Sequence, residues 1–374
     1  MLFKTLVGFV LALYSCNATI TLPVKRVSLD STSSIATKVA RRNAHLGFTT
    51  HVKVTTNAAW LVEIGIGNPA HPVNFQIDSG SALTLTGIEH GYRHTKTTKN
   101  TSVAFDENFG DQSDVKGFLV QDRFSLSHGV PFKAYLGAAF KNDFFVAAEP
   151  GRSGVLALGN RAMFDQTLSN QSNTIPTFTE SLQHAKLIEE KIVTLNLREP
   201  ASIHFGTADW SKSKGPIAYM PRKNIGPTSY WACDVYMPSL GVTAKRNQNA
   251  TSMIDSGTEL TFLARAPLLV YYEKIKEIGG VYNASTDFFQ FPKGAIPPAI
   301  DITIGETLLP LPGKAQLLAD RLKVPNGLDP SLDYSVILPA QDGAETSLIG
   351  ATLLSHYSIV FDSERDRIGF SLRA

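Results

Sequence analysis

Two stretches of this sequence place a carboxylate, two hydroxyls and a glycine in the same order. IDSGSALT begins at Ile77, and IDSGTELT begins at Ile254. In each stretch a glycine allows a tight turn just after the aspartate. A hydroxyl three residues past the aspartate can donate a hydrogen bond to the carboxylate. Such donors keep a carboxylate ionised.

Bringing the two turns together would place Asp78 beside Asp255. Two carboxylates at hydrogen-bonding distance share one proton, because both cannot ionise easily. One of them can then act as a base toward a water molecule, while the other acts as an acid toward a peptide carbonyl. Hydrolysis of a peptide bond by such a pair would need no metal, no cofactor and no covalent intermediate.

The elements that must position these turns also come in two sets. Each turn is followed by an apolar segment with glycine, SGVLALG at 153–159 and SLIGATLL at 347–354. The same pieces in the same order predict two related lobes facing each other. From residue 50 onward the chain is mostly short β-branched and aromatic runs between turn residues. Helical patterns are few, at 178–188, 266–280 and 351–358, so we expect a mainly β protein with a few short helices.

The whole pattern resembles the pepsin-like aspartic proteases, particularly their fungal, disulfide-poor members. The resemblance runs from about Trp60 to the C-terminus and rests on WLVEIGIGNPAHPVNFQIDSGS, MIDSGTELTFL and SLIGATLLSHYSIVFDSERDRIGF. It implies a bilobal double β-barrel and an aspartic endopeptidase that cleaves polypeptides at acidic pH. It also implies that Asp78 and Asp255 are the catalytic pair.

The resemblance gives supporting roles to the residues after each aspartate. It implies that serine hydroxyls bond across the lobes, that glycines allow close approach of the backbone, and that the next hydroxyl orients the aspartate. In that order the residues are Ser79, Gly80 and Ser81 in the first loop and Ser256, Gly257 and Thr258 in the second.

The flap of the family, a β-hairpin that closes over the substrate, differs here. Phe109-Gly110 stands where the family has Tyr-Gly, and Leu85 stands where it has tryptophan. In the family the tyrosine hydroxyl bonds to the indole N–H. Losing both partners together leaves no buried polar group without a partner, so we expect an apolar closure in which Phe109 and Gly110 contact substrate.

Other departures concern efficiency and specificity. Ala157 replaces a usual glycine of the first lobe, Ala351 replaces a frequent aspartate, and Gln76 adds a polar group near the substrate pocket. The alternative function is a catalytically weak or inactive binding protein of the same fold. Retention of both aspartates and both orienting hydroxyls favours the enzyme.

The N-terminal region predicts a secretory route. Lys4, the apolar run LVGFVLALY and a small-residue site ending at Ala18 predict a signal peptide over 1–18, with a membrane anchor as the alternative. Residues 1–42 carry a net charge of +5, and the rest of the chain carries −3. Residues 19–50 are therefore predicted to be a propeptide with a dibasic site at Arg41-Arg42, or else a disordered tail. The lobes are predicted at 51–196 and 197–374.

Partners follow from composition. The overall charge of +2 calls for no nucleic acid, and we expect a secreted monomer without a membrane anchor, with vacuolar delivery as an alternative. Removing the signal leaves Cys233 alone, as a core or strand cysteine without a disulfide. His90 and His94 lack a clear carboxylate partner, so no metal site is expected. Glycosylation sequons begin at Asn100, Asn170, Asn249 and Asn283.

Overall fold

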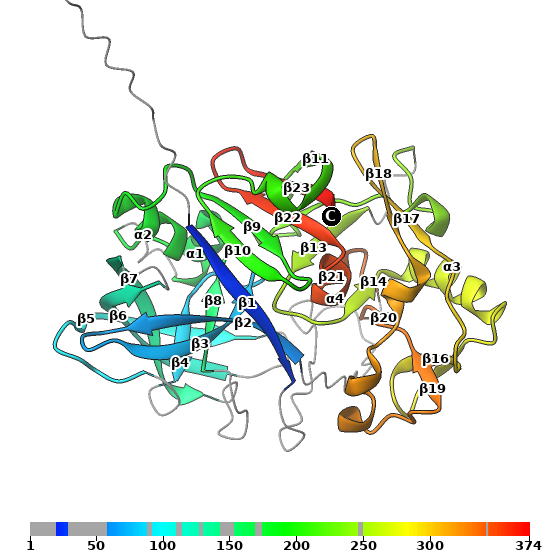
Figure 1. Cartoon of the computed structure of the whole chain (residues 1–374), viewed down its shortest axis with the longest axis horizontal. Coiled ribbons are helices and arrows are strands. Elements are labelled where there is room, and N and C mark those ends of the chain that lie inside the picture. The colour runs from blue at the N-terminus through cyan, green and yellow to red at the C-terminus, as the bar shows by residue number, and fades with distance from the viewer. Residues whose placement is uncertain are drawn as a thin grey trace, which may run out of the picture.

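The fold is known from a computed structural model, which describes residues 20–28, 58–87, 92–109, 114–126, 130–142, 153–168, 174–245, 250–341 and 343–374. Strands dominate these residues, and the α-helices among them are short, so the predicted mainly β architecture is confirmed. In Figure 1 the first half of the chain lies on one side and the second half on the other, with β9, β10, β22 and β23 between them. The predicted signal peptide, Arg41-Arg42 and His90 lie outside the described residues.

The largest sheet has thirteen strands and runs through the middle of the molecule into the first lobe (Figure 1). Its order from one edge to the other is β11 (Ser213–Pro221), β23 (Arg367–Arg373), β22 (Tyr357–Asp362), β9 (Ile192–Asn196), β10 (Ala201–Phe205), β1 (Ile20–Ser28), β2 (Ala58–Ile66), β3 (His71–Asp78), β8 (Gly154–Ala157), β4 (Leu85–Gly87), β7 (Pro131–Asn142), β6 (Asp114–Ser125) and β5 (Lys99–Asn108).

The second half of the chain adds three smaller sheets. The first has the order β12 (Ala232–Asp234), β13 (Thr251–Asp255), β21 (Ser347–Gly350), β14 (Thr261–Leu263) and β20 (Ile337–Pro339). The second joins β15 (Val281–Asn283), β16 (Phe288–Pro292) and β19 (Leu332–Tyr334), and the third joins β17 (Ile300–Ile304) to β18 (Thr307–Leu311).

The two repeated sequence pieces form the same arrangement of strands twice. In the first lobe β8 pairs parallel with β3 and antiparallel with β4, and β4 pairs parallel with β7. In the second lobe β21 pairs parallel with β13 and antiparallel with β14, and β14 pairs parallel with β20. Each candidate catalytic aspartate is the last residue of the first strand of its set, Asp78 in β3 and Asp255 in β13.

Three helices lie where the sequence predicts them, although each is shorter than its pattern. They are α2 (Phe178–His184), α3 (Arg265–Lys276) and α4 (Ala351–Leu354). The sequence analysis missed α1 (Arg161–Thr167), which starts where the Asn160 side chain accepts a hydrogen bond from the Met163 N–H. Such a side-chain cap supplies a partner for an N–H that the first turn leaves unbonded. No helix in the described ranges is long and apolar enough to cross a membrane.

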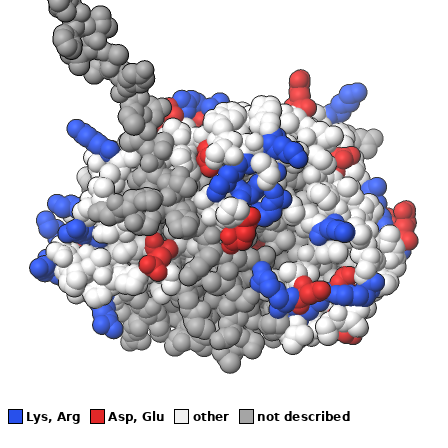
Figure 2. Space-filling view, viewed as in Figure 1, with Lys and Arg blue, Asp and Glu red and all other residues white. Residues whose placement is uncertain are grey.

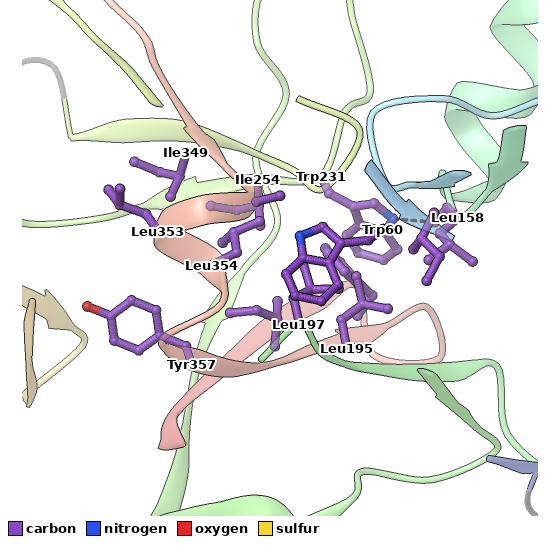
Figure 3. Close-up of a cluster of buried hydrophobic side chains, with 14 of the residues drawn as sticks. Trp60, Leu158, Leu195, Leu197, Trp231, Ile254, Ile349, Leu353, Leu354 and Tyr357 are labelled. Carbon is purple, nitrogen blue, oxygen red and sulfur yellow. Dashed lines mark hydrogen bonds between the residues drawn. The ribbon is translucent and has the colours of Figure 1, made fainter. Parts of the chain in front are cut away.

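A continuous hydrophobic core links the two lobes beneath the aspartate-bearing strands. Trp60, Leu195, Trp231 and Ile254 belong to it, and Figure 3 shows them packed together from different elements. The Trp231 indole N–H donates to the Leu158 carbonyl at 2.8 Å, which joins the second half of the chain to the segment after β8. The thiol of Cys233 is free and fully buried in this core, as the sequence predicts. The core thus fixes the strands on which the candidate site is built.

Candidate active site

The carboxylate of Asp78 is buried and holds two hydrogen bonds from its own loop. Its exposed fraction is 8 %. The Gly80 N–H donates to Oδ1 at 2.7 Å, and the Ser81 hydroxyl donates to Oδ2 at 2.5 Å. The turn after β3 therefore presents one backbone donor and one side-chain donor to the two oxygens of the same carboxylate.

Asp255 repeats this arrangement in the second lobe. Its exposed fraction is 7 %. The Gly257 N–H donates to Oδ1 at 2.8 Å, and the Thr258 hydroxyl donates to Oδ2 at 2.6 Å. Residues at the same positions of the two repeats thus make the same contacts to the same oxygens.

The two loops are joined by reciprocal hydrogen bonds between serines. The Ser79 N–H donates to the Ser256 hydroxyl at 3.0 Å, and the Ser256 N–H donates to the Ser79 hydroxyl at 2.9 Å. Each hydroxyl then donates to a carbonyl of the opposite lobe, Ser79 to Ile254 at 2.9 Å and Ser256 to Ile77 at 3.1 Å. Because all of these groups are buried, the bonds fix one loop against the other.

The glycines let each carboxylate lie against the opposite loop. A Cβ built on Gly80 would lie 2.6 Å from Asp255 Oδ1, and one built on Gly257 would overlap the carboxylate of Asp78. The structure therefore brings the two carboxylates together between the two glycines. Burial, followed by the charge of Asp255, raises the pKa of Asp78 above its ordinary value.

Gln76 also lies at this junction. It is buried, and its side-chain amide donates to the Gly257 carbonyl at 2.7 Å, across the lobe boundary. Ala157 lies beside Asp78 in the pairing of β3 with β8, whereas Gly350 lies beside Asp255 in the pairing of β13 with β21. A Cβ at Gly350 would overlap the Leu260 carbonyl. The second lobe thus requires a glycine where the first accommodates an alanine.

A cavity of about 260 Å³ opens beside the first loop. Gly80 and Ser81 form part of its wall, and Phe109, which follows β5, forms another part. Phe109 packs against the cluster of buried side chains that contains Leu85, which also lines the cavity. The structure therefore places Phe109 and Leu85 on the same pocket, while Gly110 lies outside the described residues.

Sequence reasoning missed part of the cavity wall, which comes from distant segments. Met163, Gln166 and Thr167 lie on α1, and Tyr230 lies just before β12. No local motif marks these residues.

The remaining candidate residues lie away from the loops. Asn100 is exposed in β5, whereas Asn283 is half-buried at the end of β15 and donates to Gln290 at 3.0 Å. Asn170 and Asn249 lie outside the described residues. Within the described part of the chain, no three His, Cys, Asp or Glu side chains are grouped to hold a metal.

Comparison with known proteins identifies the family. The family model for eukaryotic aspartyl proteases matches residues 59–373. The chain belongs to this family. As an aspartyl protease it is a hydrolase, an aspartic-type endopeptidase whose substrates are polypeptides.

Its relatives include fungal enzymes. Polyporopepsin of Irpex lacteus is 26% identical over 326 residues, which cover 83% of this chain and 93% of that protein. Aspergillopepsin-1 of Aspergillus oryzae is 23% identical over 352 residues, covering 91% and 86%. The crystal structure of the aspartic proteinase from Irpex lacteus matches this aspartyl protease with a TM-score of 0.74 at 21% identity, over 96% of this chain and 98% of that one. The structural match supports the pepsin-like bilobal fold.

Proposed function

We propose that this endopeptidase works through Asp78 and Asp255, which share one proton and activate a water molecule for attack on a peptide carbonyl. The observation that carries the proposal is the mirrored set of donors around the two carboxylates, one backbone N–H and one hydroxyl for each. Donors to both oxygens hold the carboxylates in place, and their proximity favours a single shared proton.

In this mechanism the ionised carboxylate takes a proton from the water as it attacks, and the protonated carboxylate donates its proton to the carbonyl oxygen. Membership of the aspartyl protease family favours activity at acidic pH. The raised pKa of Asp78 supports the shared proton, because burial and the charge of Asp255 both favour the protonated form. The proposed mechanism uses only the two carboxylates and a water molecule, and it requires no metal ion or cofactor.

The supporting roles divide between loop and flap. Gly80, Gly257 and the reciprocal bonds of Ser79 with Ser256 hold the carboxylates together, while Ser81 and Thr258 orient them. Phe109 closes the cavity beside the first loop as an apolar wall. Gly110 belongs to the same proposed flap. The proposed boundary between the lobes is residue 196, the last residue of β9.

The route of the protein is part of the proposal. Residues 1–18 are removed as a signal peptide, residues 19–50 act as a propeptide, and the product is a secreted monomeric glycoprotein that binds no nucleic acid. Figure 2 shows both signs of charge over the described part of one face. The signal-like N-terminus supports entry into the secretory route, with vacuolar delivery as the alternative destination.

The test is to express the full chain, acidify it and assay hydrolysis of a protein substrate from pH 3 to pH 6, with Asp78→Asn and Asp255→Asn as variants. We expect each substitution to reduce kcat by at least about a hundredfold, because removing one group of a proton-sharing pair abolishes general acid–base catalysis. Both variants are near-isosteric, so a folded and inactive protein is the expected result. Activity that survives either change would refute the dyad, and an inactive wild type would favour a binding protein of this fold.

A further inference from the structure

Gln76 makes a contact across the lobe boundary that has no counterpart in the repeat. It lies in β3, two residues before Asp78, and its exposed fraction is 7 %. Its Nε2 donates to the Gly257 carbonyl at 2.7 Å. This bond joins the first lobe to the loop that holds the second aspartate.

The other polar contacts that we describe within and between the two loops occur in pairs. The bonds to Asp78 repeat at Asp255, and the serine bonds run in both directions. The position in the second repeat that corresponds to Gln76 is Met253, which has no hydrogen-bond donor in its side chain. The bond from Gln76 therefore makes the two halves of the site unequal.

Gly257, whose carbonyl accepts this bond, lies close to both carboxylates. The Gly257 N–H donates to Asp255 Oδ1 at 2.8 Å, and a Cβ on Gly257 would overlap the carboxylate of Asp78. A shift of Gly257 would consequently change the hydrogen bond to one aspartate and the packing of the other. Only Gln76 among the side chains of the first lobe is seen to bond to the Gly257 carbonyl within the described residues.

We propose that Gln76 is a positioning residue, which holds Gly257 in place and thereby fixes the separation and the proton affinity of the Asp78–Asp255 pair. The inference rests on the function proposed above. Gln76 acts on the second loop through this bond, so its proposed effect on the reaction is transmitted through Gly257. An amide donor is neutral at every working pH, and it holds the loop without adding a charge beside the dyad.

The first test replaces the donor by the residue of the other repeat. Gln76→Met keeps the length of the side chain and removes the hydrogen bond. We expect kcat to fall about ten- to a hundredfold with little change in KM, as displacements of a catalytic group typically cost. Met253→Leu is the matched control, since it changes the mirrored position without removing a donor, and it is expected to keep wild-type activity. An unchanged kcat in Gln76→Met would overturn the proposal.

The second test is Gln76→Glu, whose bonding depends on pH. Protonated glutamic acid can donate its O–H to the Gly257 carbonyl, whereas the ionised form has no donor and repels that oxygen. Burial and the neighbouring aspartates raise the pKa of this glutamate above its ordinary value of about 4.3. The activity of this variant relative to wild type should therefore be highest at pH 3 and fall as pH rises through that raised pKa. A ratio that rises with pH, or that is already low at pH 3, would contradict the role of the bond.

A third readout separates this inference from the proposed function. The titration of the aspartate carboxyls, followed by ¹³C NMR in the wild type and in Gln76→Met, reports on the pair without requiring turnover. A changed titration supports the positioning role even in a protein that fails to cleave substrate, whereas an unchanged titration overturns it. An inactive wild type with an altered titration in the variant would therefore refute the enzyme mechanism alone.

Discussion

The side chains of Ser79, Asp78, Ser256 and Asp255 at the junction of the lobes are buried and hydrogen-bonded, so substituting one of them should change stability as well as the proposed chemistry. Ser79 is fully buried, accepts from the Ser256 N–H and donates to the Ile254 carbonyl. Removing its hydroxyl leaves two buried backbone groups without this partner. Asp78 is the opposite case, a group whose burial is unfavourable when it is charged.

The substitution Ser79→Ala should lower the free energy of unfolding by about 1–3 kcal/mol, since buried polar groups lose a partner. Ser211→Ala is the control, because Ser211 is exposed and its hydroxyl bonds to Asp209 at the surface. Urea unfolding at neutral pH, where self-digestion is suppressed, measures the free energy of unfolding of both variants. Equal midpoints and slopes for Ser79→Ala and wild type would show that the cross-lobe bonds contribute nothing to stability.

Asp78 should make the protein less stable as pH rises. Its pKa in the folded state lies above the ordinary value of 3.8, chiefly because of burial. In the pH range above 3.8 the folded protein therefore binds a proton that the unfolded chain has released, and the free energy of unfolding falls with rising pH. The loss is complete once pH exceeds the folded-state pKa.

The measurement uses an Asp255→Asn background, which prevents self-digestion and retains the effect of burial on Asp78. Thermal unfolding from pH 4 upward should show a decline that the double variant with Asp78→Asn lacks. Parallel curves for the two proteins would contradict the raised pKa.

At the level of elements, the sequence predicts what local chemistry specifies. The turn residues of the two loops follow from glycine and hydroxyl spacing alone, so both loops could be expected before the structure was known. Helix α1 was not predicted, because seven residues are too few to show a repeating apolar pattern with helical spacing. The cavity wall at Met163 and Tyr230 depends on contacts between distant segments, which no local pattern encodes.

The β5–β6 hairpin carries the apolar wall of the cavity, so truncating that wall should weaken substrate binding and closure. Phe109→Ala is expected to lower kcat/KM about four- to tenfold, because half burial of an aromatic ring contributes roughly 0.8–1.5 kcal/mol, half of what full burial contributes. Phe109→Tyr, which keeps the ring, is the control and should stay within about threefold of wild type. Steady-state kinetics on one peptide substrate measures kcat/KM for both variants and the wild type. An alanine variant with the kcat/KM of wild type would show that Phe109 is not part of the flap.

At the scale of the whole molecule, one strand near the N-terminus connects two parts of the largest sheet. β1 pairs with β10 through residues 20–24 and with β2 through residues 25–28. In the thirteen-stranded sheet β1 lies between β10 and β2. It therefore connects the strands from β11 to β10 in the sheet order with the strands from β2 to β5. The predicted propeptide thus contributes a central strand, whose loss would leave the ladder groups of two neighbouring strands without these partners.

Cleavage after Arg42 in the folded protein should therefore have a different outcome from synthesis without residues 1–42. We expect the cleaved segment that contains β1 to stay bound at neutral pH, because its backbone bonds to both neighbours are already formed. The truncated chain should give less soluble protein and a lower thermal midpoint. Size-exclusion chromatography with mass spectrometry of the folded peak detects the retained segment, and Arg42→Gln provides an uncleaved control. A truncated chain with the yield, thermal midpoint and activity of the full-length product would show that folding does not require β1. A mature enzyme whose sequence begins near Thr19 would show that β1 is not part of a removed propeptide.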